Sequence, residues 1–402
     1  MIVIPIVVPV PVTIGAPFVT MRIVPGVVFI PAAVPLGIQS CFRNLSLAAM
    51  FAVFTGFMRT FRIVIVATST APGVTCQNEF RPRRFLRGGH LQTIASFLWP
   101  RRFLLDTPEQ RLVEVEPGIQ VMCHCYWQKE PGSTLTAILV HGLEGSSESK
   151  YMLGIAEKGT AAGMNVILMN QRTCGGTDRL APTLYHSGRS GDVVAVAKNL
   201  VEQDHISCFA LCGFSMGGNL VLKAAGEWGS DAPLELIAVA AVCPALDLAA
   251  SADALHAPIN RLYEQYFLWK LKGRMRSKAE CFPGKYDLSR MRGVKSLREF
   301  DDKVTAFYCG FDGASDYYAR AAASNVVDRI LVPTFILHAR NDPFIRILRE
   351  TRRKIAANPN ITFRETDDGG HCSFIGERDG YDGHFAEREV VEFLRKVSSQ
   401  HL

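Results

Sequence analysis

From about residue 78 onward, short and almost continuously apolar runs alternate with segments whose apolar residues recur at helical spacing. Strand-like segments, most of them apolar runs, predict eight strands, at 111–116, 119–127, 134–140, 164–170, 208–214, 234–245, 332–339 and 361–366. The helical spacing predicts helices at 150–162, 192–203, 219–228 and 386–397. Apolar strands that alternate with helices are typical of a mostly parallel sheet covered on both faces. The sequence therefore predicts an α/β domain over residues 78–402.

Residues 249–331 interrupt this alternation, because they are richer in charged and aromatic side chains, as in RLYEQYFLWKLKGRMR. We interpret them as a helical insertion between the sixth and seventh strands. Parallel sheets bind their ligands at the carboxyl ends of the strands, where such an insertion would form a cap. The alternative is that these are ordinary surface helices. The aromatic residues Tyr266, Phe267 and Trp269 then belong either to a core or to the lining of a pocket.

The N-terminal segment, residues 1–77, has a different composition from the rest of the chain. It is apolar and contains no acidic residue, but prolines such as Pro5, Pro9 and Pro11 interrupt it. Proline breaks helix interiors, and freed carbonyls are costly in a bilayer. Two interpretations stand side by side: a hydrophobic membrane anchor, and a misassigned start codon with the true start near Met50 or Met58. A secretory signal fits less well, since no small-residue cleavage site follows a single apolar region.

Composition excludes several classes of function. The net charge is +6, and beyond the arginines of residues 1–77 the chain is nearly neutral, without a basic stripe for nucleic acid. The eleven cysteines form no C-x-x-C pair and are typical of free thiols in a reducing, cytoplasmic compartment. No cysteine or histidine cluster has the spacing of metal ligands, and no nucleotide-binding motif is present. We therefore expect no metal, no cofactor and no nucleic-acid partner, and the oligomeric state stays open.

The stretch GFSMG, residues 213–217, follows a predicted strand and precedes a predicted helix. A serine on such a tight turn is held in a strained conformation that exposes its hydroxyl, and the flanking positions must be small because strand and helix pass closely. Gly213 and Gly217 meet that requirement. Ser215 is therefore the candidate nucleophile, although a glycine-rich connection would also explain the motif alone.

A serine nucleophile requires a base and an acid, and both candidates follow predicted strands. His371 lies in GGHCSF, shortly after the last strand, and Asp342 lies in ARNDPF, just past the seventh. The carboxylate would fix the tautomer of the imidazole and stabilise its cation. Asp247, after the sixth strand, is the second candidate for the acid. The order serine, aspartate, histidine along the chain is the one expected for α/β-hydrolases.

The tetrahedral intermediate of acyl transfer needs two backbone donors. Met216, directly after the serine, supplies one candidate N–H, and Leu143, in the loop after the third strand, supplies the other. His141 precedes Leu143 in the sequence HGLEGSS, and we interpret it as a residue that shapes this loop rather than as a catalytic group.

These residues also resemble a known family, the YheT-like branch of the α/β-hydrolases. The resemblance covers about residues 80–400 and is carried by RGGHLQT (87–93), HGLEGSS (141–147), NQRTCGGT (170–177), LYHSG (184–188), GFSMGGN (213–219), ARNDPF (339–344) and GGHCSF (369–374). It implies a carboxylic-ester hydrolase with Ser215 as nucleophile, Asp342 as acid and His371 as base. Bacterial members are thought to act on short-chain esters and eukaryotic relatives on glycerolipids and phospholipids, some with an N-terminal membrane anchor. The resemblance to bacterial members excludes residues 1–77, and RGGHLQT has no role in the triad argument.

The sequence thus predicts a serine esterase or lipase that forms an acyl-enzyme on Ser215 and takes a small-molecule ester or a lipid. Three alternatives stay open. An acyltransferase or a thioesterase would use the same triad with another acceptor or leaving group, and a binding protein on the hydrolase fold would not be catalytic. We expect a cytoplasmic protein, attached to a membrane if residues 1–77 act as an anchor.

Overall fold

A computed structural model describes residues 80–401. The expectations for residues 1–77 lie outside these described residues. Within residues 80–401, no helix combines the length and the apolarity needed to cross a lipid bilayer.

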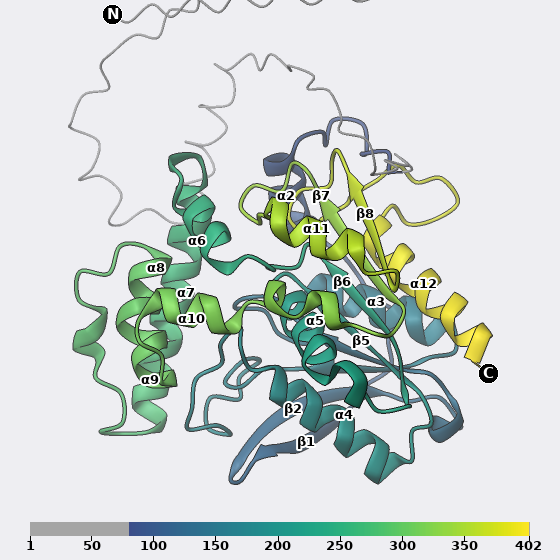
Figure 1. The fold of residues 1–402 in the computed structure, drawn as a ribbon, viewed down its shortest axis with the longest axis horizontal. Coiled ribbons are helices and arrows are strands. Elements are labelled where there is room, and N and C mark those ends of the chain that lie inside the picture. Colours follow the sequence, from purple (N-terminus) through teal and green to yellow (C-terminus); the bar gives the residue numbers. More distant parts are fainter. Residues whose placement is uncertain (1–79, 402) are drawn as a thin grey trace, which may run out of the picture. The chain divides into compact units, whose positions relative to one another are not determined.

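One sheet of eight strands forms the centre of the domain (Figure 1). The strands are β1 (Glu109–Glu116), β2 (Ile119–Tyr126), β3 (Thr136–Val140), β4 (Asn165–Met169), β5 (Phe209–Phe214), β6 (Leu236–Val242), β7 (Thr334–Ala339) and β8 (Ile361–Thr366). Their order across the sheet is β1-β2-β4-β3-β5-β6-β7-β8. The pairs β1–β2 and β2–β4 are antiparallel, and all other pairs are parallel. The predicted fold class, a mostly parallel eight-stranded sheet, is confirmed.

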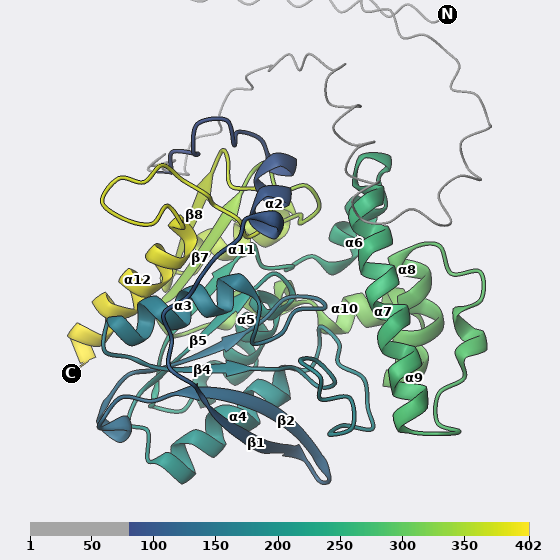
Figure 2. The same ribbon diagram turned by 180° about the vertical axis from the view of Figure 1, so that it is seen from behind.

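Helices cover both faces of the sheet, which explains why its central strands are apolar throughout. Seen from the two sides in Figures 1 and 2, α4 (Ser190–Asp204), α5 (Met216–Trp228) and α11 (Arg349–Ala357) lie on one face. The helices α3 (Lys150–Ala161) and α12 (Phe385–His401) lie on the other. Along β3, Ala137 and Leu139 pack into one core cluster while Ile138 and Val140 pack into the second.

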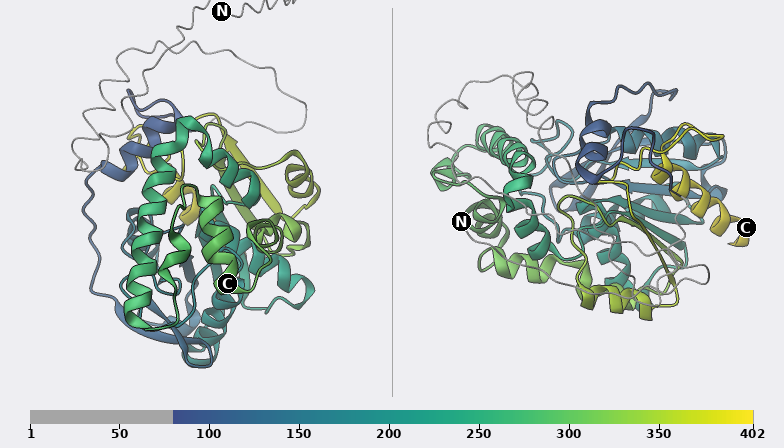
Figure 3. Two further views of the ribbon diagram at one scale, coloured as in Figure 1. Left: turned by 90° about the vertical axis from the view of Figure 1, so that its left-hand side faces the viewer. Right: turned by 90° about the horizontal axis from the view of Figure 1, so that it is seen from above.

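The segment between β6 and β7 is helical, as the pattern predicted. Its α-helices are α6 (Leu248–His256), α7 (Arg261–Cys281), α8 (Leu297–Phe300), α9 (Phe307–Cys309) and α10 (Ala314–Ala321). They lie beside one another at one end of the sheet (Figure 3). Helix α2 (Gly89–Leu98) precedes the first strand and was not predicted, and neither was α11.

Candidate active site

Ser215 lies on a sharp turn between β5 and α5. Its backbone has φ 54° and ψ −117°, a region that is strained for any residue except glycine. The two flanking glycines allow this turn, because their neighbours leave no room for a side chain. A Cβ on Gly213 would lie 2.2 Å from the carbonyl oxygen of Gly217, and a Cβ on Gly217 would lie 2.1 Å from the carbonyl oxygen of Val140. The turn therefore depends on glycine at both positions.

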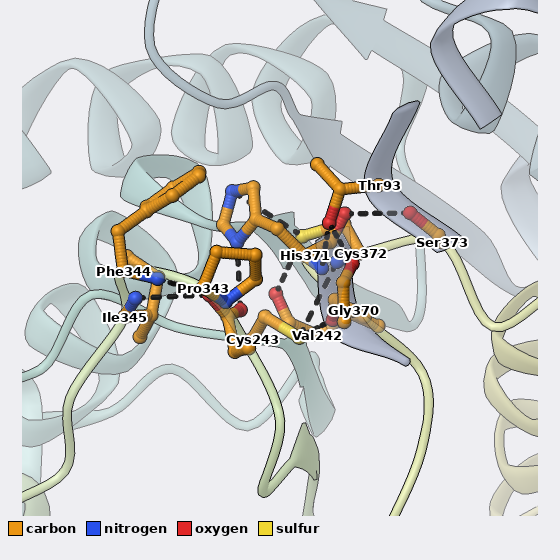
Figure 4. A network of polar contacts seen from close by, with 12 residues as sticks. Thr93, Val242, Cys243, Pro343, Phe344, Ile345, Gly370, His371, Cys372 and Ser373 are labelled. Carbon is orange, nitrogen blue, oxygen red and sulfur yellow. Dashed lines mark hydrogen bonds and ion pairs between the residues drawn. The ribbon is translucent and has the colours of Figure 1, made fainter. Parts of the chain in front are cut away.

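His371 and Asp342 form a hydrogen-bonded pair beside this turn. The Nδ1 atom of His371 lies 2.8 Å from Oδ2 of Asp342, which is almost completely buried. The other carboxylate oxygen, Oδ1, accepts hydrogen bonds from the backbone N–H groups of Phe344 (3.1 Å) and Ile345 (2.9 Å). Figure 4 shows His371 above the backbone that follows Asp342. A carboxylate held in this way fixes the Nδ1–H tautomer of the imidazole, so that the lone pair able to accept a proton is on Nε2, which lies 3.9 Å from Sγ of Cys372.

The electrostatics of the pair favour a charged imidazole. Burial raises the pKa of Asp342, but the facing His371 lowers it by more. The pKa of Asp342 therefore lies below its usual value. Burial lowers the pKa of His371, but Cys372 and Asp342 raise it by more. The net result is a pKa of His371 well above its usual value. An imidazole that takes a proton during a reaction is therefore stabilised in place.

Asp247, the second candidate for the acid, has a different role. Its Oδ2 accepts a hydrogen bond from the N–H of Leu348 (2.8 Å), and its Oδ1 accepts one from the hydroxyl of Thr351 (2.9 Å). Both partners lie at the start of α11. Asp247 directly precedes α6 and therefore anchors the start of α11 to the start of α6.

Ser215 and His371 line the same cavity, a cleft of about 360 Å³ that also contains Phe97, Tyr266 and Cys372. Within residues 80–401, the hydroxyl of Ser215 makes no hydrogen bond. In free enzymes the bond between nucleophile and base is often long and tightens only when substrate binds.

The loop after β3 lies against Ser215. A Cβ on Gly142 would lie only 3.1 Å from the Cβ of Ser215. The N–H of Gly142 donates to the hydroxyl of Tyr151 (3.0 Å), and the N–H of Glu144 donates to that of Tyr185 (3.2 Å). Between them, the N–H of Leu143 has no acceptor among residues 80–401. Met216 is the first residue of α5, a position whose N–H has no partner within the helix.

Two further side chains hold this loop. Fully buried His141 lies with Nδ1 2.8 Å from the carbonyl oxygen of Gly142, and its Nε2 accepts from the N–H of Gln171 (3.1 Å). Burial lowers the pKa of His141 to about 4, so the ring is neutral. From α7, Arg274 donates two hydrogen bonds, of 2.8 and 2.9 Å, to the carboxylate of Glu144. The insertion is thereby connected directly to the loop that carries Leu143.

The segment RGGHLQT, for which the sequence indicated no role, supports the His371 loop. The hydroxyl of Thr93 accepts a hydrogen bond from the N–H of His371 (2.9 Å). The buried amide of Gln92 donates to the carbonyl oxygen of Ile375 (3.0 Å) and accepts from its N–H (2.8 Å). A Cβ on Gly89 would lie 1.7 Å from the carbonyl oxygen of Asn341. Only the resemblance to a family singled this segment out, because its partners lie about 280 residues further along the chain.

A second, smaller cavity meets Ser215 on the side of the insertion. It has a volume of about 100 Å³ and lies against Ser215, Leu143 and Met216. Its walls are mostly apolar and include side chains from α6, α7 and α10. The 100 Å³ cavity and the 360 Å³ cleft thus adjoin the same serine from different directions.

The structure also brings together two cysteines that sequence spacing did not connect. The ligand atoms of Cys243, His371 and Cys372 all lie within 4.8 Å of one another. The sequence shows no cluster with metal-ligand spacing, because Cys243 and Cys372 are 129 residues apart and meet only through the fold. Cys372 borders the 360 Å³ cleft. Burial raises the pKa of the Cys372 thiol, but contacts with Cys243 and His371 lower it by more, so that its pKa is about 6.

Comparison with known proteins agrees with this architecture. A family model described as alpha/beta hydrolase fold matches residues 138–377. The putative esterase YheT of Escherichia coli is 30% identical over 318 residues, which cover 77% of this chain and 91% of that protein. Phospholipase ABHD3 of Mus musculus is 30% identical over 244 residues, or 60% of this chain and 58% of the mouse protein.

Among solved structures, 2,6-dihydroxy-pseudo-oxynicotine hydrolase superimposes with a TM-score of 0.50 at 19% identity, covering 77% of this chain and 71% of that one. This likeness concerns the fold alone. The family match and the long alignment with the bacterial esterase together place the chain: it belongs to the α/β-hydrolase fold family, in the branch that includes YheT.

Proposed function

We propose that the protein hydrolyses carboxylic esters through an acyl-enzyme on Ser215. The chain is a carboxylic-ester hydrolase by its family, and the catalytic residues and the substrate are our proposal. His371 takes the proton of the Ser215 hydroxyl as the oxygen attacks the ester carbonyl, and Asp342 orients and stabilises the imidazolium. Water then attacks the acyl-enzyme with His371 again as base. The observation that carries the proposal is the 2.8 Å His371–Asp342 pair, which opens onto the cleft that Ser215 lines.

The N–H groups of Leu143 and Met216 are the proposed oxyanion donors. Both residues line the 100 Å³ cavity together with Ser215. Donors that are held in place before the reaction stabilise developing charge without reorganisation, and loss of one such donor costs on the order of 10²–10³ in kcat. The hydrogen bonds of Gly142 and Glu144 on either side hold Leu143 in position.

The two cavities are proposed to hold the two halves of the ester. His371 must protonate the leaving alcohol, so the alcohol lies in the cleft that His371 lines. The acyl chain then extends on the opposite side, into the cavity beside the oxyanion donors. That cavity of about 100 Å³ is smaller than the engineered cavity of about 150 Å³ that holds benzene in another protein. We therefore favour esters of short acyl chains.

Fluorophosphonate labelling tests the nucleophile. We expect the full-length protein to be labelled and Ser215→Ala to lose the label. The matched control is Ser251→Ala, because Ser251 also lines the small cavity but is hydrogen-bonded to the N–H of Arg346. Labelling that persists in Ser215→Ala would refute the assignment. A folded protein without label or esterase activity would favour the alternative of a binding protein.

A series of p-nitrophenyl esters tests the substrate. We expect kcat/KM to be highest for short acyl chains and to fall once the chain exceeds the small cavity. A maximum at long chains would instead favour a lipase. Adding an alcohol or using a thioester separates hydrolysis from acyl transfer and thioester cleavage, since all three pass through the same acyl-enzyme.

A further inference from the structure

Two cysteines and the candidate base meet beside the 360 Å³ cleft, which His371 and Cys372 line, while Cys243 is fully buried. Cys243 directly follows β6, while His371 and Cys372 belong to the loop after β8 (Figure 4). The Sγ of Cys372 lies 3.9 Å from Nε2 of His371, and the N–H of Cys372 donates to Sγ of Cys243 (3.4 Å). Both cysteines have positive φ angles, 43° for Cys243 and 56° for Cys372, which is uncommon for residues with side chains.

We propose that Cys243 Sγ, Cys372 Sγ and His371 Nε2 form a binding site for a thiophilic divalent cation of the Zn²⁺ class. Zinc bonds of about 2.3 Å to sulfur and about 2.0 Å to nitrogen place neighbouring tetrahedral ligands roughly 3.5–3.8 Å apart. The sulfur–nitrogen distance of 3.9 Å is close to that value, and all three atoms lie within 4.8 Å of one another. Shifts of about an ångström would complete the site. Binding requires both cysteines as thiolates and Nε2 of His371 without a proton, so any protons that these three atoms carry pass to solvent. The two thiolates then balance the charge of the cation.

The other side of the imidazole already has the partner that metal sites use. Histidine ligands commonly donate their second N–H to a carboxylate, which fixes the tautomer and strengthens the ligand. Asp342 occupies that position at 2.8 Å from Nδ1 of His371. The fourth ligand position would face the cleft, where water or the Ser215 hydroxyl can reach it.

A cation in this position would inhibit hydrolysis rather than assist it. It takes the lone pair of Nε2 that must accept the proton of Ser215. This consequence rests on the proposed function, whereas binding of the cation does not. A neighbouring group, Cys243 with His338 and Asp342, is a weaker candidate because all three side chains are buried and Asp342 already accepts three hydrogen bonds.

Binding is tested with Cd²⁺, which reports thiolate ligation through its ultraviolet charge-transfer absorption. The full-length Ser215→Ala variant, kept reduced with a phosphine, serves as the parent so that turnover plays no part. We expect the parent to absorb more strongly than the Cys243→Ser/Cys372→Ser double variant, and this difference in absorption to saturate at one equivalent of Cd²⁺. Each single cysteine variant should lose most of this signal, while Cys309→Ser, a partly exposed cysteine outside the cluster, should keep it. Asp342→Asn should weaken binding about 10–100-fold.

Inhibition is tested with Zn²⁺ on the wild-type protein, each variant being normalised to its own activity in chelator. We expect Zn²⁺ to inhibit the wild type, chelator to restore activity, and both cysteine variants to be at least ten times less sensitive. A charge-transfer signal that survives in the double variant would overturn the site. Inhibition that a reductant but not a chelator reverses would also overturn it, in favour of a Cys243–Cys372 disulfide. If the protein shows no esterase activity, the proposed function fails while the Cd²⁺ titration still decides the site.

Discussion

The candidate active site has two halves that are built in different ways. The Ser215 half is contained in five consecutive residues, 213–217, which include the turn and both glycines, and Val140 of β3 adds the close contact that Gly217 accommodates. The His371 half depends on distant residues, since the N–H of His371 is bound by Thr93, 278 positions earlier in the chain. A turn encoded by a short stretch of sequence therefore presents the nucleophile, while long-range hydrogen bonds position the base. The difference determines which substitutions should damage each half and how severely.

The largest effect is expected in the Ser215 half, from Gly217→Ala. The added Cβ would lie 2.1 Å from the backbone oxygen of Val140, and a backbone atom in the middle of the sheet cannot move aside. We expect a loss of about 4 kcal/mol or more in the free energy of unfolding, or no folded protein, in denaturant titrations. The control is Gly273→Ala in α7, where nothing lies within 4 Å and alanine should stabilise the helix by up to about 1 kcal/mol. Equal unfolding midpoints for the two variants would contradict this account of the turn.

In the His371 half, Asp342→Asn should lower kcat by on the order of 10⁴, because the amide no longer fixes the required tautomer. It should also change the pH profile. Cys372 and Asp342 raise the pKa of His371, and only the neutral imidazole can act as base. Removing the Asp342 charge lowers that pKa, so the acidic limb of kcat/KM against pH should move to lower pH. An acidic limb that stays in place or moves to higher pH would show that Asp342 does not act on the base. Asp247→Asn, at the second candidate acid, should leave the limb unmoved.

The same contrast explains how much could be predicted from the sequence. The sequence pattern predicted all eight strands. The signal is clearest for β3 to β7, which are buried along their whole length and therefore have an apolar composition that is visible locally. The turn at Ser215 was predicted because its signal, GFSMG, also lies within a short stretch of sequence. Asp342 and His371 were predicted because parallel strands bring their carboxyl ends to one edge, and the two side chains do lie together.

What the sequence did not indicate depends on contacts between distant segments. The role of Thr93 and Gln92, the Arg274–Glu144 pair and the Cys243–Cys372 contact all join residues at least 129 positions apart. Helix α11 was missed because its sequence, RETRRKIAA, is mostly charged and buries only Thr351 and Ile355. Hydrophobic periodicity is a weak signal where so few positions face the core.

Thr93→Val should have an intermediate effect. The substitution keeps the shape of the side chain but leaves the N–H of His371 without its acceptor. An unpaired buried donor costs about 1–3 kcal/mol, so we expect kcat to fall roughly 10–100-fold with little change in KM. Thr93→Ser, which keeps the hydroxyl, should restore most of the activity.

The control for this prediction is Thr160→Val. Thr160 donates a hydrogen bond to the carbonyl oxygen of Ala156, four residues earlier, just as Thr93 donates to that of Gly89, but it lies in α3. If both valine variants lose the same activity, the loss reflects helix stability and not the position of His371. A rise in KM without a change in kcat would indicate a binding role for Thr93.

The smallest effect is expected in the 100 Å³ cavity beside Ser215, which we propose to hold the acyl chain. Ala252, on α6, lines the 100 Å³ cavity, and Ala252→Val adds two methyl carbons to it. Each carbon excluded from an apolar site costs about 0.8 kcal/mol, or roughly fourfold in kcat/KM. We expect the longest acyl chain that the wild type accepts to lose about 4- to 15-fold, while an acetate ester changes little. Phe97→Leu, in the cleft of the His371 half, should alter the preference for the alcohol but not for the acyl chain. An unchanged acyl preference in Ala252→Val, together with a changed one in Phe97→Leu, would reverse the assignment of the two cavities.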